Sequence, residues 1–298
     1  MNVSTSRKEA FGVPHSARFK VWSGKLARFV RSQPLGSVGA FLLLLTTVVA
    51  VLTPVIAPYD PLAMDTKSPH VAPGTRYLLG TDGFGRDVLS RILYGSRISL
   101  YVGFLSVGIG TGAGAVLGLL GGYLGGKVDL ITQRVLDGMM AFPAIVLALV
   151  IMSALGSSLN NVVIAIAIVF LPKAARIVRS SALSIRETQY VEAARAAGAG
   201  EFRIAFLHVL PNCLAPWFVF ATGALGQAIV TEATLSFLGL GTPPPIPSWG
   251  SMISGEARSM ATVAPWLAIF PGLALSVTVY GLNLFGDSLR DVLDPRLR

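Results

Sequence analysis

The sequence predicts an all-α integral membrane protein with six transmembrane helices. Of its 298 residues, 53% are hydrophobic and only 13% are charged, and the mean hydropathy is +0.66. A soluble globular chain carries about 25% charged residues. Six long apolar runs, separated by polar or Pro- and Gly-rich segments, place the chain in a lipid bilayer.

The composition also argues against several classes of protein. The formal charge of +9 lies mostly between the apolar runs, without the helix-motif or aromatic context of a nucleic-acid-binding patch, so no nucleic-acid partner is expected. The single cysteine, Cys213, cannot form an internal disulfide. The three histidines, His15, His70 and His208, are too scattered for a metal-ligand pattern, and no metal site is predicted.

A spanning helix needs about 20 predominantly apolar residues. The sequence predicts such helices over 38–58, 99–123, 139–155, 161–178, 213–235 and 262–285. The first run is too long for the apolar region of a secretory signal, which has about 7–15 residues, so we expect a membrane anchor. Pro143 and Pro172 interrupt the third and fourth runs, and membrane helices tolerate such prolines where neighbours satisfy the backbone.

The distribution of Lys and Arg predicts the orientation, because cytoplasmic loops are enriched in them. The N-terminal arm 1–37 is strongly basic, and an even number of spans places both termini in the cytoplasm. The loops after the second and fourth spans are basic as well, with Lys127, Arg134, Lys173, Arg176, Arg179, Arg186, Arg195 and Arg203. We expect Lys173, Arg176 and Arg179 to anchor the fourth span, with contact to an ATPase or to anionic lipid as the alternative.

Four glycines recur at every fourth position of the second span. They are Gly110, Gly114, Gly118 and Gly122. Residues at this spacing lie on one face of a helix, and small residues there allow another membrane helix to approach closely. We therefore predict a helix-packing face and no ligand role.

Two loose matches to nucleotide-binding motifs do not have the required context. The glycines at 110–114 match the dinucleotide fingerprint but lie within an apolar run, and 121–127 has phosphate-loop spacing but continues with Val128 instead of Ser or Thr. There is also no G-x-S-x-G or H-E-x-x-H motif. We predict no catalytic residue and no cofactor bound by this chain.

The strongest motif lies in the predicted loop between spans four and five. Glu192, Ala193 and Ala194 are followed by Gly198 and, further on, by His208, Leu210 and Pro211. Good helix formers over 189–197 end at a glycine, and a second short helix over 201–207 is expected to stop at Pro211. Two short helices at an angle make a protruding knob.

This loop, about 181–212, resembles the EAA loop of ABC importer permeases, with His208 where the general motif has isoleucine. In that family the knob docks into a groove on an ATPase subunit. The resemblance therefore implies an ATPase-coupling role for the seven residues of the motif: Glu192, Ala193, Ala194, Gly198, His208, Leu210 and Pro211.

Three further stretches, 79–100, 232–253 and 286–296, resemble the C-type permease subunits of dipeptide, oligopeptide and nickel ABC importers. The first reads as a structured turn, in which Asp82, Arg86 and Asp87 pair locally. In the second, prolines and Trp249 suggest an external cap with the Trp at the membrane interface. Glu232 is either a gate or pathway residue or a carboxylate that fixes helices by hydrogen bonds.

The resemblance implies a type I ABC importer permease fold and a multi-pass protein of the bacterial inner membrane. The segments are a basic arm (1–37), the first span (38–58), an external segment with the Gly-Thr-Asp motif (59–95), a permease core (96–287) and a cytoplasmic tail (288–298). Implied partners are a second, B-type permease, one or two ABC ATPase subunits that hold ATP and Mg, an extracytoplasmic substrate-binding protein, and membrane lipid.

The implied cargo is a di- or oligopeptide, with nickel chelates, glutathione or another small molecule as alternatives. A self-contained channel or secondary transporter is the competing class. It predicts charged residues in the middle of spans or inverted repeats, and neither occurs in the sequence.

Overall fold

The computed structural model describes residue 31 and residues 33–293, and within them the regular structure is helical apart from one isolated bridge between Thr81 and Asp87. Most of the predicted arm 1–37 and the last five residues of the tail lie outside the described residues. The helices are α2 (Pro34–Ile56), α3 (Val88–Leu124), α4 (Gly126–Met140), α5 (Ala144–Leu155), α6 (Leu159–Arg186), α7 (Gln189–Ala196), α8 (Glu201–Ile204), the π-helix η1 (Ala205–Val209), α9 (Leu210–Phe237), α10 (Trp249–Ile253), α11 (Glu256–Ser259) and α12 (Trp266–Leu293).

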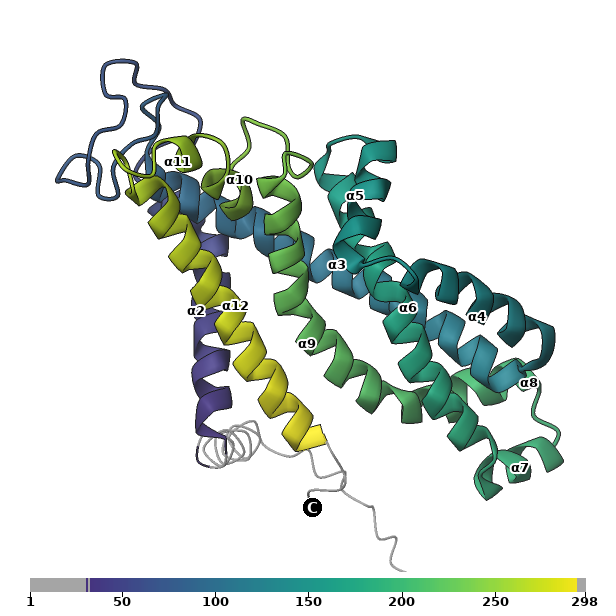
Figure 1. Cartoon of the computed structure of the whole chain (residues 1–298). Helices are drawn as coiled ribbons and strands as arrows, with labels where there is room; N and C mark the ends of the chain where they lie inside the picture. The colour runs from purple at the N-terminus through teal and green to yellow at the C-terminus, as the bar shows by residue number, and fades with distance from the viewer. Residues whose placement is uncertain (1–30, 32, 294–298) are drawn as a thin grey trace, which may run out of the picture.

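The long helices run between two ends of the molecule (Figure 1). One end, below in this view, carries α7, α8, the start of α2 and the end of α12; we refer to it as the α7 end. The opposite end carries the segment 57–87 together with α10 and α11, and we refer to it as the α10 end.

Five of the six predicted spans are confirmed as long apolar helices, and the third needs a correction. Within the described residues, five helices are long and apolar enough to cross a membrane, and α4 and α5 make a sixth only if they are counted together. They meet at an angle of 94°, so the predicted run 139–155 is not one helix: it covers the end of α4, the bend and α5. Pro143 is the cause, because proline has no N–H to donate and its ring disfavours helical backbone at the preceding Phe142.

Helices α3 and α6 pack along the predicted glycine face. A Cβ atom at Gly110, Gly114, Gly118 or Gly122 would approach a backbone carbonyl oxygen of α6 too closely. The four carbonyls belong to Ala167, Leu171, Ala175 and Arg179, which also lie four residues apart. The two helices therefore meet along matching stripes, backbone against backbone.

Ion pairs hold α4 against α6. Arg179 donates to both carboxylate oxygens of Asp129 at 2.5 and 2.6 Å, and Arg176 pairs with Asp137. The sequence interpretation of Arg176 and Arg179 as membrane anchors missed these contacts, because nothing in the spacing shows that α4 folds back along α6. Lys173 is exposed.

Helix α2 packs on α12 and presents its other side outward. Gly39 lies so close to α12 that a Cβ atom would overlap Gly281 and Phe285, and a Cβ at Gly281 would overlap Leu42. The remaining surface of α2 is apolar and exposed, with Leu35, Val38, Phe41, Leu44, Leu45, Val48, Val51, Leu52, Val55 and Ile56. This side of the molecule suits contact with lipid chains.

At the α10 end, the motif Gly80–Asp87 forms a tight turn that starts α3. The Asp82 carboxylate accepts hydrogen bonds from the backbone N–H groups of Phe84 and Arg86, at 3.0 and 2.9 Å, and from Arg86 Nε at 2.7 Å. Asp87 is the N-cap residue of α3, and its carboxylate accepts from the backbone N–H and the hydroxyl of Ser90. Local pairing of these side chains agrees with the interpretation of a structured turn.

Trp249 is part of the core beneath α10, so its interpretation as a membrane-interface residue is wrong. Its side chain is only 2% exposed, and its Nε1–H donates to the carbonyl of Ile92 on α3 at 3.0 Å. Gly95, one turn further along α3, makes room for the indole ring. The tryptophan thus fastens α10 to α3.

The α3–α6 seam predicts opposite effects for two glycines of the same helix. Gly118→Ala would force a methyl group into the Ala175 carbonyl, and we expect a loss of about 1–3 kcal/mol in the free energy of unfolding. Gly112 has no atom within 4 Å of a Cβ position, so Gly112→Ala should leave stability unchanged or slightly raised. Thermal unfolding of the two purified variants in the same detergent checks this, and equal midpoints would contradict the seam.

Candidate functional site

Helix α7 ends in a Schellman motif centred on Gly198. The backbone N–H of Ala199 donates to the carbonyl of Ala194 at 3.1 Å, and that of Gly198 donates to the carbonyl of Arg195 at 3.0 Å. Gly198 has φ +83°, a left-handed conformation that costs little for glycine and more for other residues. The predicted helix end at Gly198 is therefore explained by its backbone conformation.

The second short helix does not stop at Pro211, contrary to the prediction. α8, η1 and α9 follow one another without a break, and Pro211 lies in the first turn of α9. The π-helical turn explains this, because its backbone N–H groups bond one residue further back, as Leu210 does to Ala205. This wider turn makes room for the proline ring. It also tolerates the absence of the hydrogen bond that proline cannot donate.

The knob formed by α7, α8 and the turn between them (residues 189–204, hereafter the α7–α8 knob) stands on an apolar cluster. Val191 of α7 and Ile204 of α8 are both fully buried. They pack with buried residues from α3, α6, η1 and α9, namely Ala115, Leu119, Tyr123, Val178, Ala182, Val209 and Cys213. Because the cluster joins the knob to three spans, the knob cannot tilt without disturbing them.

Polar contacts tie the same knob to the end of α3. The hydroxyl of Tyr123 donates to the carboxylate of Glu201 and accepts from Arg195 Nη2 at 3.5 Å. Arg195 Nε lies 3.4 Å from Glu201 Oε1. Arg186 Nη1, at the end of α6, donates to the Gly122 carbonyl at 3.1 Å. One tyrosine thus contacts side chains from both helices of the knob.

Sequence reasoning missed Tyr123, Arg186 and Glu201. Arg186 contacts a residue 64 positions away, and Tyr123 and Glu201 are 78 positions apart. No local motif marks such contacts. Tyr123 directly follows Gly122, the last glycine of the packing face, and that adjacency was the only available signal.

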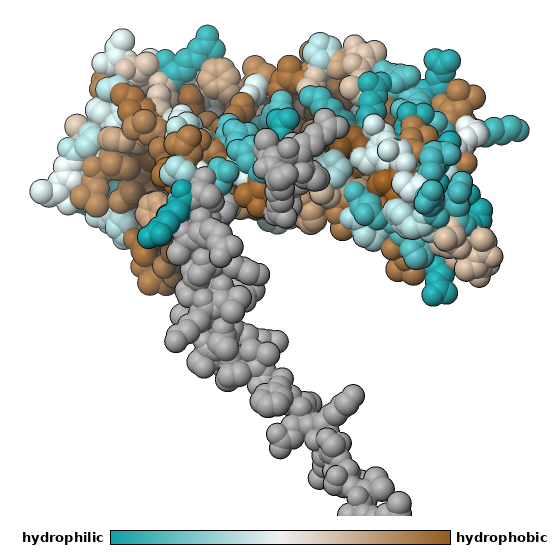
Figure 2. Space-filling view, turned by 90° about the horizontal axis from the view of Figure 1, so that it is seen from below, coloured by the Kyte–Doolittle hydropathy of each residue, from teal (hydrophilic) through white to brown (hydrophobic). Residues whose placement is uncertain are grey.

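The outward surface of the knob is mixed in character. Glu192, Ala193 and Gly198 are exposed, and the apolar side chain of Phe202 is 67% exposed. Next to the knob, in η1, Leu207 is 62% exposed. Figure 2, which views the molecule from below, shows hydrophilic residues gathered over the side that carries α7 and α8. An exposed surface with apolar side chains among polar ones is typical of a protein-interaction site.

Three of the four remaining motif residues make contacts that support the knob. Ala194 and Leu210 are partly buried and pack against the apolar cluster. The backbone carbonyl of His208 accepts from Asn212 Nδ2 at 2.8 Å and from the Tyr190 hydroxyl at 3.3 Å. Pro211 is exposed next to Asn212.

Glu232 lies far from the knob along α9, in a fully buried polar cluster. Its Oε1 accepts from the Ser236 hydroxyl at 2.8 Å, and its Oε2 accepts from the Ser99 hydroxyl of α3 at 3.3 Å. The Ser236 hydroxyl also accepts from Ser248, which precedes α10, at 3.4 Å. This geometry favours the helix-fixing interpretation of Glu232, and a gate role stays a prediction.

The two nucleotide-like glycine patterns lie in helical surroundings. Residues 110–114 belong to α3, and 121–127 cover the end of α3 and the start of α4, so neither follows a strand. In the part of the chain that the structure describes, no group of three His, Cys, Asp or Glu side chains is arranged to hold a metal ion.

Comparison with known proteins gives consistent matches. The family described as binding-protein-dependent transport system inner membrane component matches residues 114–298. A Brucella suis chain named as a peptide transport system permease protein is 47% identical over 88% of each chain. The glutathione transport system permease protein of Pectobacterium atrosepticum is 44% identical over 93% of this chain and 92% of its own. The dipeptide transport system permease protein of Alkalihalophilus pseudofirmus is 42% identical over 90% and 88%, respectively.

Among solved structures, the fold is similar to that of a chain in the inward-facing MetNI methionine ABC transporter. The TM-score is 0.56 at 20% sequence identity, and the match covers 69% of this chain and 97% of the other. At this identity the similarity concerns the fold alone.

The conformation of Gly198 predicts a local effect of substitution. Gly198→Ala places a side chain at φ +83° with no neighbouring atom within 4 Å, so only backbone strain of about 1–2 kcal/mol is added. We expect roughly tenfold faster amide hydrogen exchange at residues 197–199, since 1.4 kcal/mol corresponds to about tenfold.

Two further variants serve as controls for this strain. Gly198→Asn should exchange more slowly than Gly198→Ala, because asparagine tolerates the left-handed region better. Gly200 has φ −67° and equally open surroundings, so Gly200→Ala should leave amide exchange at residues 197–199 unchanged. Equal amide exchange in the unmodified chain and in the three variants would remove any special role for the backbone of Gly198.

Proposed function

This chain belongs to the family of binding-protein-dependent transport system inner membrane components, and from that membership we propose that it imports peptides as the permease subunit of a bacterial ABC transporter. It is a multi-pass inner-membrane protein with a type I ABC importer permease fold. The chain is not an enzyme, because ATP is hydrolysed by partner ATPase subunits in this family. ATP and Mg are bound by those partners in our proposal.

The α7–α8 knob is the surface through which the ATPase subunits act. The observation that carries this assignment is the combination of an exposed outer surface with a buried base. Val191 and Ile204 join the knob to the apolar cluster, and the Tyr123 hydroxyl connects Arg195 and Glu201 to the end of α3. A force on the exposed side therefore reaches α3, α6 and α9 through packed side chains.

The α7 end faces the cytoplasm in this proposal. The basic N-terminal arm and the basic residues around α6 to α8 support that orientation, because positively charged loops stay inside. The α10 end then faces outward, where a substrate-binding protein delivers cargo. A second permease subunit pairs with this chain in the membrane, one or two ATPase polypeptides complete the complex, and lipid contacts the apolar side of α2.

Peptides are the cargo that the relatives support. Their names specify dipeptides, peptides and glutathione, and glutathione is itself a peptide of three residues. Glutathione is therefore the second candidate cargo within the same class.

An experiment on the assembled transporter tests this function. The chain, reconstituted in proteoliposomes with its ATPase subunits, second permease and binding protein, should accumulate a labelled dipeptide only when ATP and Mg are present. Uptake by this chain alone, without nucleotide, would overturn the proposal in favour of a channel or secondary transporter.

A substitution on the knob should uncouple the transporter. Ala193→Arg places a long cation on the exposed side of α7, and we expect at least a tenfold loss of ATP-driven uptake together with loss of the ATPase subunits on purification. Ser259→Arg makes the same change in charge on exposed α11 at the other end, and this control should retain the ATPase subunits. Equal retention in both variants would argue against docking at α7.

Labelling of single cysteines tests the orientation. Cys213 is buried, so the unmodified chain should not react with a membrane-impermeant maleimide in intact cells. Ser259→Cys, exposed on α11, should be labelled from outside, whereas Ser184→Cys, exposed near α7, should react only after permeabilisation. The reverse pattern would invert the topology.

A further inference from the structure

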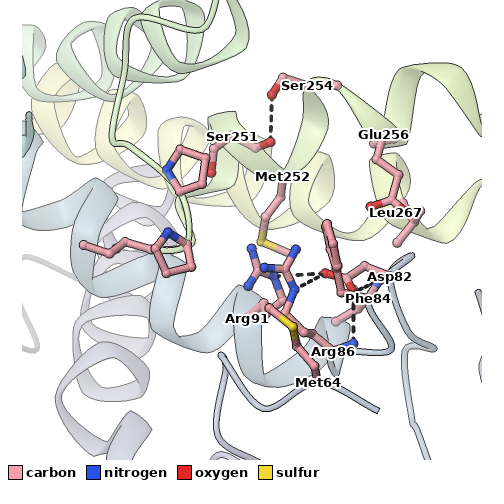
Figure 3. Close-up of a pocket in the computed structure, with 16 residues that line it drawn as sticks. Met64, Asp82, Phe84, Arg86, Arg91, Ser251, Met252, Ser254, Glu256 and Leu267 are labelled. Atoms are coloured by element: carbon pink, nitrogen blue, oxygen red, sulfur yellow. Dashed lines mark hydrogen bonds and ion pairs between the residues drawn. The ribbon is translucent and has the colours of Figure 1, made fainter. Parts of the chain in front are cut away.

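A pocket of about 520 Å³ opens at the α10 end, between the turn that precedes α3 and the segments around α10 and α11 (Figure 3). Its walls come from parts of the chain that are far apart in sequence, including residues near 64, 82–91, 244–257 and 267. This volume lies in the range of sites that enclose small molecules.

Two arginines and one aspartate form the charged part of the pocket. Arg86 Nε lies 2.7 Å from Asp82 Oδ2, and Arg91 Nε lies 3.6 Å from the same oxygen. The two arginine side chains are 11% and 9% exposed. Because two guanidinium groups share one carboxylate, this group carries a net charge of about +1 in a largely buried place.

The arginines keep free donors. Arg91 Nη1 donates to the Pro61 carbonyl at 3.0 Å. Within residues 33–293, Arg91 Nη2 and both Nη atoms of Arg86 donate to no protein acceptor. Figure 3 shows the two guanidinium groups close together beside Asp82 and Met252. Unpaired donors of this kind are suited to a planar, bidentate anion such as a carboxylate.

The rest of the lining is apolar, with one acidic group. Met64, Phe84 and Ile246 are exposed at the rim, and Met252 lies next to the arginines. Methionines adapt to side chains of different shape, as a site for varied ligands requires. Glu256 of α11 lines the pocket as well; its Oε1 lies 2.5 Å from His70 Nε2, and its side chain is one-third exposed.

We propose that this pocket binds a short peptide through its C-terminal carboxylate, held by Arg86 and Arg91. The apolar rim takes the peptide side chains, and Glu256 attracts the terminal ammonium. This inference rests on the proposed function, in which the cargo is a peptide and the α10 end faces outward. It gives the permease its own peptide site, separate from that of the binding protein.

A zwitterionic peptide fits these observations better than an acidic side chain of a partner protein. The pocket offers cationic donors and a separate carboxylate, and a free peptide carries the two complementary charges. A protein side chain would use the arginines alone. The two ligands differ in their dependence on the terminal ammonium, and that difference can be measured.

Binding to the assembled transporter in nanodiscs, without binding protein or ATP, tests the proposal. Alanyl-leucine should bind at least about tenfold more tightly than alanyl-leucine amide, which lacks the carboxylate, because hydrogen bonds to charged groups are the stronger kind. N-acetyl-alanyl-leucine should also bind more weakly, since it lacks the ammonium. These comparisons change only the ligand, so they do not depend on the folding of a variant.

Two matched variants locate the site. Arg86→Gln removes one guanidinium and leaves Asp82 its backbone donors and Arg91, and it should abolish the preference for the free carboxylate. Arg258→Gln makes the same change on exposed α11 outside the pocket lining and should preserve the preference. A preference for the free carboxylate that survives Arg86→Gln would place the site elsewhere and overturn the proposal.

The outcomes separate this inference from the proposed function. ATP-driven dipeptide uptake by the full complex, together with equal affinity for the acid and the amide, overturns the pocket and leaves the importer intact. Preference for the acid with no effect of acetylation would favour an acidic side chain of a partner protein and would also overturn the peptide proposal. Absence of ATP-driven dipeptide uptake counts against the proposed function itself.

Discussion

Between α3 and α6, four glycines of one helix lie against four backbone carbonyls of the other, and no side chain separates them. In a bilayer, close backbone contact of this kind replaces the hydrophobic effect as the source of helix association. The position of α6 on α3 determines where Arg179 meets Asp129, and hence where α4 lies. It also brings Arg186 to the Gly122 carbonyl, at the base of the knob.

The knob depends on the same seam. Ala115, Leu119 and Tyr123 of α3 form one side of its apolar base, and Val178 and Ala182 of α6 form another. A separation of α3 from α6 would open this cluster directly. The exposed helices α7 and α8 are therefore held by the membrane-spanning part and not by their own few contacts, which a helix of eight residues and one of four could not supply alone.

Much of this architecture could be predicted from the sequence, and the failures have physical causes. Hydropathy located every long span, and the spacing of four located the packing face, because both signals are local. The sequence marked Pro143 as an interruption but not the 94° bend, and it wrongly predicted a helix end at Pro211. A proline breaks one helix and is accommodated by a π turn in the other, and no local signal separates the two cases. The Tyr123–Glu201 contact joins residues 78 positions apart, and no local pattern encodes it.

The uninterrupted run from Glu201 to Phe237 makes the knob and the Glu232 cluster parts of one rod. At 1.5 Å per residue, its 37 residues extend about 55 Å, so a rigid tilt of about 10° at one end would displace the other by about 10 Å. The π turn at Ala205–Val209 and Pro216 within α9 are the points where such a rod bends. If these two points are stiff, a displacement of α8 is transmitted to the contacts with Ser99 and Ser248. If they are flexible, the helix bends there and less of the displacement is transmitted.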